Sequence, residues 1–134
     1  MSPLRAATVP DELVDLVTSN CFAHVASINP DGSISSHILW IDWDGEHLLM
    51  STPVGSVKCR NWRLDPHVGI SVMDRTNPYR YVQVTGRVTE IRPDVDLAVI
   101  DRLSHRYVGH QYEDRDEARE VVVISPDRVR ASLG

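Results

Sequence analysis

Hydrophobic and polar residues alternate along most of this chain, and apolar residues at helical spacing occur in only a few places. The clearest alternation runs from Tyr81 to Ile91, where valines occupy one face and polar side chains the other. This pattern is typical of a strand that packs one face and exposes the other. Similar segments, bounded by turn signals such as Asn29-Pro30-Asp31-Gly32 and Asp44-Gly45, predict five further strands at 22–28, 34–43, 47–51, 67–73 and 120–125.

Three segments are predicted to be helical. In 9–19, Pro10 suits the first helical position, and apolar residues recur at a spacing that places them on one side. A short helix is expected at 56–64, and a longer one begins near Pro93 and ends after Arg106. Because the helices do not alternate with the strands, a parallel doubly wound sheet is not expected. The pattern favours a mainly β (α+β) fold, a small barrel of about six antiparallel strands with peripheral helices.

Composition limits the classes of protein to which the chain can belong. Its 134 residues, 42% of them hydrophobic, suit one domain spanning 1–134. The formal net charge of -5 and the lack of a basic run argue against nucleic-acid binding, and no apolar run is long enough to span a membrane. Cys21 and Cys59 form no paired motif, and the chain starts without a signal-peptide pattern. We therefore expect a soluble, cytoplasmic protein.

Several common catalytic patterns are missing from the sequence. It contains no dinucleotide-binding glycine motif, no phosphate-binding loop and no nucleophile elbow. His105 and His110 are five residues apart and would lie on different sides of a helix, so no metal site is expected. Four aspartates at predicted turns and helix starts are interpreted as turn or capping residues: Asp31, Asp44, Asp94 and Asp96.

The most informative segment leaves a strand through a turn at Gly55 and enters the short helix. Free backbone amides at the start of a helix, together with nearby hydroxyls and cations, suit a phosphate group. The residues that could converge on such an anion are Ser51, Thr52, Ser56, Lys58 and Arg60. The alternative interpretation is that the cations only solvate an exposed helix.

A second candidate lies where a loop leads into the strand at Tyr81. There Tyr79 and Arg80 could stack on a flat ring, although tyrosines in such places commonly pack at a barrel mouth or an interface. No residue is assigned a catalytic role.

Two tryptophans are predicted to lie on opposite faces of one strand. Trp40 and Trp43 are three residues apart, so one can pack in the core while the other meets a ligand or a partner. His37 shares the face of Trp43 and is either a ligand contact or a structural histidine.

Six segments, in this order, carry a resemblance that covers nearly the whole chain: Asn29-Pro30-Asp31-Gly32, Trp40-Ile41-Asp42, Ser51-Thr52-Pro53, the stretch 58–66, the strand 81–88 and the closing stretch 124–129. They resemble the flavin-reductase-like split β-barrel proteins of the pyridoxamine phosphate oxidase-like superfamily. More narrowly, they are similar to the actinobacterial branch that uses the deazaflavin F420.

The resemblance implies a homodimer with cofactor sites at the subunit interface. It places the cofactor phosphate near Lys58 and Arg60, the ring along the strands of Trp40 and of Ser51 and Thr52, and Tyr79 and Arg80 as contributions from the partner subunit. Family members often carry a basic residue where Ser56 stands, which bears on the choice between F420 and FMN. The implied activity is hydride transfer between F420 and an unsaturated conjugated small molecule. An FMN-dependent oxidase or reductase and a non-catalytic F420-, flavin- or haem-binding protein are the alternatives.

Overall fold

The computed structural model describes residues 4–134, with side chains from residue 7 onward. The strands are β1 (Leu4–Ala6), β2 (Ala23–Ile28), β3 (Ile34–Leu39), β4 (Asp42–Trp43), β5 (Leu48–Pro53), β6 (His67–Met73), β7 (Arg80–Pro93) and β8 (Arg119–Leu133). The helices are α1 (Asp15–Thr18), α2 (Val57–Leu64) and α3 (Ala98–Val108), with 3₁₀ turns at Asp11–Leu13 and Val95–Leu97.

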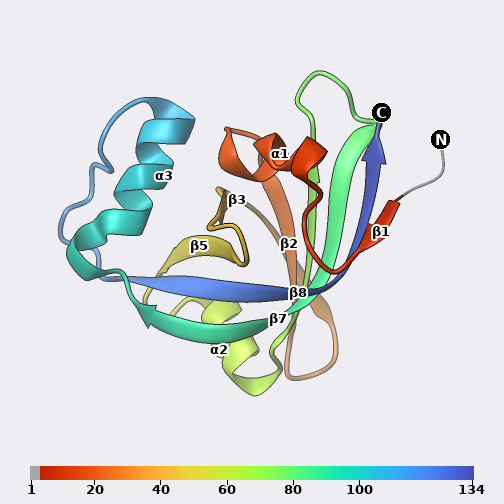
Figure 1. Cartoon of the computed structure of the whole chain (residues 1–134). Coiled ribbons are helices and arrows are strands. Elements are labelled where there is room, and N and C mark those ends of the chain that lie inside the picture. The colour runs from red at the N-terminus through yellow and green to blue at the C-terminus, as the bar shows by residue number, and fades with distance from the viewer. Residues whose placement is uncertain (1–3) are drawn as a thin grey trace.

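All strands within the described residues belong to one antiparallel sheet with the order β3-β2-β6-β7-β8-β5-β4, and β1 pairs with β8 beside this path. β7 and β8 are long and bend as they cross the molecule, so the sheet curls around its own core (Figure 1). β3 and β5 lie near opposite ends of the strand order and do not pair with each other. The barrel is therefore split, which confirms the predicted fold class.

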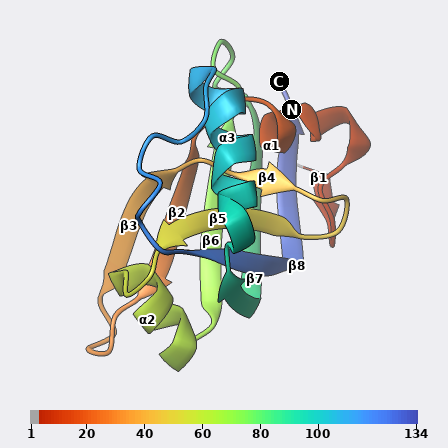
Figure 2. The same ribbon diagram turned by 90° about the vertical axis from the view of Figure 1, so that its left-hand side faces the viewer.

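The core fills the interior of this curled sheet. The inward residues of β7, Val82 and Val84, are buried, whereas Gln83 and Thr85 between them are exposed, as the alternation predicted. The consecutive aliphatics Val121–Ile124 of β8 are all buried, because β8 is covered on both faces. The helices lie outside the sheet (Figure 2): α3 stands over β5, and α2 lies at the opposite end of the molecule from the β6–β7 loop.

Two elements that the sequence predicted as continuous are interrupted in the structure. The helix expected at 9–19 is a 3₁₀ turn followed by the single turn of α1, although its apolar residues Leu13, Leu16 and Val17 are buried as expected. The strand expected at 34–43 is interrupted between β3 and β4, because the N–H of Ile41 donates to the Tyr107 hydroxyl (3.0 Å) instead of to a neighbouring strand. Trp40 therefore lies outside any strand.

The last strand is much longer than predicted. The sequence suggested an end at Ser125, but β8 runs through Pro126 to Leu133. Pro126 pairs with Gly86 at an irregularity in the β7–β8 register. A Cβ atom at Gly86 would lie only 2.4 Å from the carbonyl oxygen of Ser125, so the close approach of the two strands requires glycine here.

None of the helices in the described part of the chain has the length and apolar character needed to cross a membrane.

Candidate functional site

The opening of the barrel between β3 and β5 is the candidate site. β3 pairs with β2 on one edge and with no described strand on the other, while β5 pairs with β4 only through Leu48 and Leu49. A cavity of about 260 Å³ lies at this opening, lined by side chains from both strands, from α3 and from the start of β8. Backbone groups along unpaired strand edges are free to bind a ligand that carries its own donors and acceptors.

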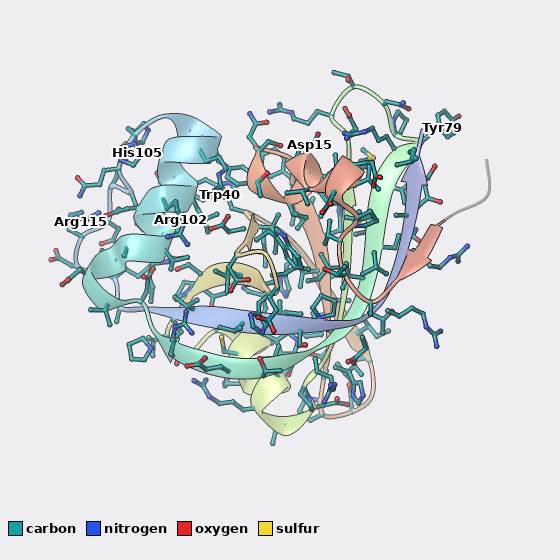
Figure 3. The ribbon with its side chains drawn as sticks, viewed as in Figure 1. Asp15, Trp40, Tyr79, Arg102, His105 and Arg115 are labelled. Atoms are coloured by element: carbon teal, nitrogen blue, oxygen red, sulfur yellow. The ribbon has the colours of Figure 1, made fainter. Side chains whose placement is uncertain are left out.

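Trp40 forms a wall of this cavity and of a neighbouring one of about 380 Å³. Its ring stacks on Tyr107 of α3, with centroids 5.3 Å apart and an interplanar angle of 14°. The Tyr107 hydroxyl donates to the carbonyl of Cys21 (2.6 Å) and accepts the N–H of Ile41 (3.0 Å), which fixes the tyrosine. Burial is the main cause that raises the pKa of Tyr107 to about 12. Trp40 is thus a flat platform, braced from behind, between α3 and the barrel (Figure 3).

A buried arginine joins β5 to β8 at the base of the same cavity. Arg119 donates to the hydroxyl (3.0 Å) and the carbonyl (2.9 Å) of Ser51, and it pairs with Glu117. Ser51 in turn donates to Asp94 (3.3 Å), whose carboxylate also accepts two backbone N–H groups at the start of α3. Arg119 and Ser51 therefore hold the opening in shape. Asp94 caps the helix, as its position near Pro93 suggested.

Of the three hydroxyls before and at the start of α2, those of Thr52 and Ser56 lie together, and that of Ser51 lies apart from them. Ser51 and Thr52 are consecutive strand residues and point to opposite faces of β5, so their hydroxyls do not converge with each other; their role in binding a cofactor stays a prediction. The Thr52 hydroxyl is buried beneath α2, 3.1 Å from the sulfur of Cys59 and 3.3 Å from the hydroxyl of Ser56. Ser56 caps α2 by accepting the N–H of Cys59 (3.2 Å). These hydroxyls are committed to contacts within the chain.

The cations of α2 are placed differently from its hydroxyls. Arg60 is exposed, whereas Lys58 is partly buried close to His37 of β3 and to Arg119 of β8. Burial is the main cause that lowers the pKa of Lys58; Cys59 acts to raise it, and Arg119 to lower it. Among the described residues, no carboxylate contributes to the pKa of Lys58. A partly buried cation without an acidic partner is a good binding group for an anion from outside.

Tyr79 and Arg80 lie far from these groups within one chain. Figure 3 shows Tyr79 on the β6–β7 loop, well away from Trp40, and its side chain is 75% exposed. Arg80 forms ion pairs with Asp15 (2.6 Å) and Asp74 (3.0 Å), which fasten α1 to this loop. Their role as contributions from a partner subunit stays a prediction.

The sequence reasoning missed the clamp that holds α3 over the opening. Asp42, almost fully buried, accepts Arg102 (2.8 Å) and Arg106 (2.7 Å) of α3. Burial acts to raise the pKa of Asp42, but hydrogen bonds from Arg106, the N–H of Trp43 and Arg102 outweigh it and keep the pKa below its ordinary value. The two arginines are four residues apart and therefore lie on one side of α3, and this spacing could have indicated a shared acidic partner.

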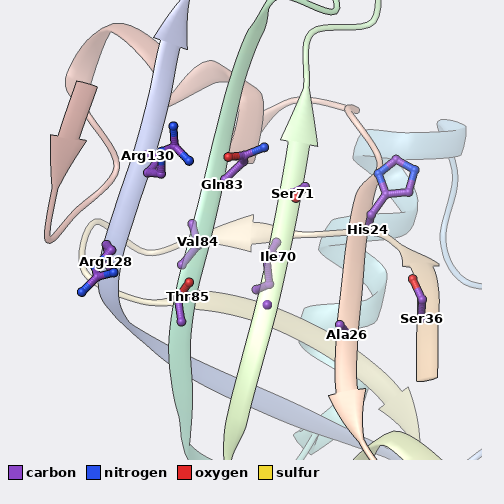
Figure 4. A pocket seen from close by; sticks show the side chains of 11 residues that line it. His24, Ala26, Ser36, Ile70, Ser71, Gln83, Val84, Thr85, Arg128 and Arg130 are labelled. Carbon is purple, nitrogen blue, oxygen red and sulfur yellow. The ribbon is translucent and has the colours of Figure 1, made fainter. Parts of the chain in front are cut away.

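The outward face of the sheet carries a separate, broader hollow (Figure 4). It has a volume of about 490 Å³ and lies across β2, β3, β6, β7 and β8. Arg128 and Arg130 border it on β8, and Ile34 and Ile38 stand exposed on β3 at its other side. β3 and β8 contribute to both this face and the opening.

The comparisons with known proteins agree with this architecture. A model of the pyridoxamine 5'-phosphate oxidase family matches residues 9–133. A solved structure described as an F420 reductase is similar, with 34% identity, a TM-score of 0.80 and coverage of 90% of this chain and 98% of that one. A conserved hypothetical protein of Mycobacterium tuberculosis is also similar, with 25% identity, a TM-score of 0.74 and coverage of 95% and 87%.

A more distant likeness shows the fold alone. The FAD and haem binding protein of Mycobacterium smegmatis has 19% identity and a TM-score of 0.67, and the match covers 97% of this chain and 74% of that one. No curated protein matches the chain. The family match extends over nearly the whole chain, and the similar structures share its fold over most of their length. The chain therefore belongs to the pyridoxamine 5'-phosphate oxidase family.

Proposed function

We propose that this protein is an F420H2-dependent oxidoreductase that reduces unsaturated, conjugated small molecules. The observation that carries the proposal is the opening itself: a partly buried cation without an acidic partner at one end, Lys58, and a braced aromatic platform at the other, Trp40. A flat heterocycle attached to a phosphate-bearing chain matches this arrangement of groups. The 34% identity with a structure described as an F420 reductase favours the deazaflavin over other ring systems.

The residues present fit such a group. Lys58 and Arg60 would bind its phosphate, and Trp40 would lie beside its ring. The unpaired edges of β3 and β5 offer backbone groups to the polar rim of the ring. When bound, the cofactor supplies the hydride, so the protein needs no nucleophile and no metal.

The chain's own residues orient the reactants and keep water out. α3 covers the opening, because the clamp through Asp42 and the Tyr107 hydroxyl fasten it to the barrel. Ile100 and Leu103 of α3 face the cavity and make its wall apolar. A conjugated, largely apolar substrate fits between this wall and Trp40.

We also propose that the working form is a homodimer, with cofactor sites at the subunit interface. The outward sheet face supports this proposal, because no other described part of the chain covers it and because Ile34 and Ile38 are 68% and 64% exposed there. Replacing Ile34 with glutamate should lower the molar mass measured by light scattering from that of a dimer to that of a monomer. An unchanged mass would argue against this face as the interface.

Titration of the protein with F420, followed by cofactor fluorescence, tests the proposed function. Lys58→Met should weaken binding about 10- to 100-fold, since one charge-assisted contact of about 1.5–3 kcal/mol is lost. Arg87→Met is the matched control, because it removes one positive charge from an exposed ion pair with Asp127 and should leave the affinity unchanged. Absence of binding by the unmodified protein at micromolar F420 would refute the proposal.

FMN is the alternative cofactor, because the same cations can hold its phosphate. Ser56 leaves the choice between the two cofactors open, since its hydroxyl caps α2 and adds no positive charge to the phosphate position. A purified protein with flavin absorbance would favour FMN. Tight F420 binding without reoxidation of F420H2 by enones, quinones or biliverdin would instead indicate a non-catalytic cofactor-binding protein.

A further inference from the structure

Two basic side chains meet at the α2 end of the opening without an acidic partner. The Nε2 atom of His37 is buried and has no hydrogen-bond partner among the described residues. Lys58, the chain's single lysine, is partly buried and lies close enough for its charge to lower the pKa of His37. Buried polar atoms are nearly always hydrogen-bonded, so an orphaned ring nitrogen next to an unpaired ammonium group indicates a missing partner.

Asn29, in the turn between β2 and β3, links α2 to β3 through hydrogen bonds. Asn61 of α2 donates to the side chain of Asn29 (2.8 Å), which also accepts the hydroxyl of Ser35 (2.9 Å). Ser35 and His37 are two residues apart and share one face of β3. Lys58 and Asn61 are three residues apart and share one side of α2. Because Asn29 links Asn61 to Ser35, the side of α2 that carries Lys58 is held near the face of β3 that carries His37.

The charge that acts on the pKa of His37 is positive and belongs to Lys58 of α2. Arg119 of β8 acts in turn on the pKa of Lys58, and it has its own carboxylate partner in Glu117. From β2, its cross-strand neighbour is the uncharged Val25. Burial first, and then the charge of Lys58, lowers the pKa of His37 below its ordinary value. An anion bound between the two nitrogens would reverse this effect, because it would stabilise the charged imidazole.

We propose, building on the phosphate position of the proposed function, that His37 is a further nitrogen ligand of the anion site, in addition to the cations of α2, and takes up a proton from solvent when the anion binds. Lys58 and His37 then hold a phosphate or sulfate group from two elements, α2 and β3. Binding becomes tighter as the pH falls through the titration range of the histidine. By linkage, each unit by which the anion raises the pKa of His37 strengthens binding about tenfold between the high-pH and low-pH limits.

Inorganic sulfate is the probe for this inference, because it does not titrate near neutral pH and any proton taken up must enter the protein. The six histidines can be followed individually by ¹H–¹⁵N NMR of their imidazole rings between about pH 5.5 and about pH 8. Saturating sulfate should raise the pKa of His37 by about one unit or more. His47 and His67, each paired with an aspartate, should not move and serve as internal controls.

Two variants separate the parts of the inference. Lys58→Met should raise the pKa of His37 in sulfate-free buffer, since the neighbouring charge is gone, and should abolish the response to sulfate. His37→Asn keeps a polar side chain that cannot be charged, and should remove the pH dependence of sulfate affinity while leaving the protein folded.

The inference is overturned if sulfate binds without moving the pKa of His37, if the pH dependence persists in His37→Asn, or if sulfate does not bind near Lys58. The experiment contains no F420, so its outcome is independent of the cofactor. A response of His37 to sulfate in a protein that does not bind F420 would uphold the anion site and reject the proposed function. F420 binding by a protein whose His37 does not respond to sulfate would uphold the proposed function and reject the role of His37 in the anion site.

Discussion

Replacing Tyr107 with phenylalanine removes one oxygen atom and leaves the ring that stacks on Trp40. That oxygen makes two hydrogen bonds to the backbone, accepting from the N–H of Ile41 (3.0 Å) and donating to the carbonyl of Cys21 (2.6 Å). Ile41 is fully buried and Cys21 is 6% exposed, so water cannot readily take over either bond. The substitution therefore leaves two buried backbone groups without partners.

The expected cost follows from these two groups. An unsatisfied buried donor or acceptor costs about 1–3 kcal/mol, and the desolvation of the hydroxyl itself is recovered, so we expect a net loss of about 2–4 kcal/mol in the free energy of unfolding. Urea unfolding, followed by circular dichroism, measures this loss. Tyr79→Phe is the matched control, because it removes the same atom from a side chain that is 75% exposed, and it should change stability by less than about 0.5 kcal/mol.

The pH dependence gives a second measurement on the same hydroxyl. The pKa of Tyr107 rises from its ordinary value of 10.0 to about 12 in the folded protein. Its contribution to stability is therefore fully present below pH 10.0 and is lost as the pH rises through about 12. Tyr107→Phe should lack this part of the loss of stability at alkaline pH. Equal stabilities of Tyr107→Phe and Tyr79→Phe would refute the reasoning, because they would show that the hydroxyl does not hold the chain between β3 and β4.

Four further substitutions, one of them a control, test other parts of the fold by urea unfolding. Asp42→Asn should destabilise the protein by about 2–3 kcal/mol near neutral pH, and the difference from the unmodified protein should shrink as the pH falls through the lowered pKa of Asp42, below 3.8; a pH-independent difference would contradict the ion-pair clamp. Asp94→Ala should cost about 1–2 kcal/mol by uncapping α3, and an unchanged midpoint would show that the helix start needs no cap. Gly86→Ala should cost about 3 kcal/mol, because its Cβ would lie 2.4 Å from a backbone oxygen. Gly69→Ala is the control and should be tolerated, because its Cβ would have only an ordinary contact at 3.9 Å. Equal effects of the two substitutions would show that β7 and β8 can move apart.

The position of Trp40 in the candidate site depends on where its strand ends, and the sequence pattern did not reveal that end. The segment 34–43 contains no proline or glycine that would mark a break, yet the strand ends before Trp40, because the hydroxyl of Tyr107, more than sixty residues away, accepts the N–H of Ile41. This long-range bond turns Trp40 away from a strand face and onto α3. Local periodicity cannot reveal such a partner, because it contains no information about contacts between distant residues.

The same limit applies to the polar residues of the site. The sequence correctly identified the turn and cap positions Asp44 and Asp94, whose side chains bond to backbone groups close in the chain. It grouped Ser51 and Thr52 with Lys58 by proximity in sequence, but the alternation of a strand sends the two hydroxyls to opposite faces. Arg119 was missed, since its role depends on lying beside β5 in the sheet.

The sequence by itself determined the fold class, the single curled sheet and the α2 segment that carries Lys58, because these follow from local spacing of apolar residues, prolines and glycines. Only the tertiary structure decided that β3 and β5 leave an opening between them, that α3 is clamped across it by Asp42, and that His37 meets Lys58 without an acidic partner. Those features depend on pairings between segments that are distant in sequence. The free energy of each contact depends on which groups the fold brings together and how far it shields them from water.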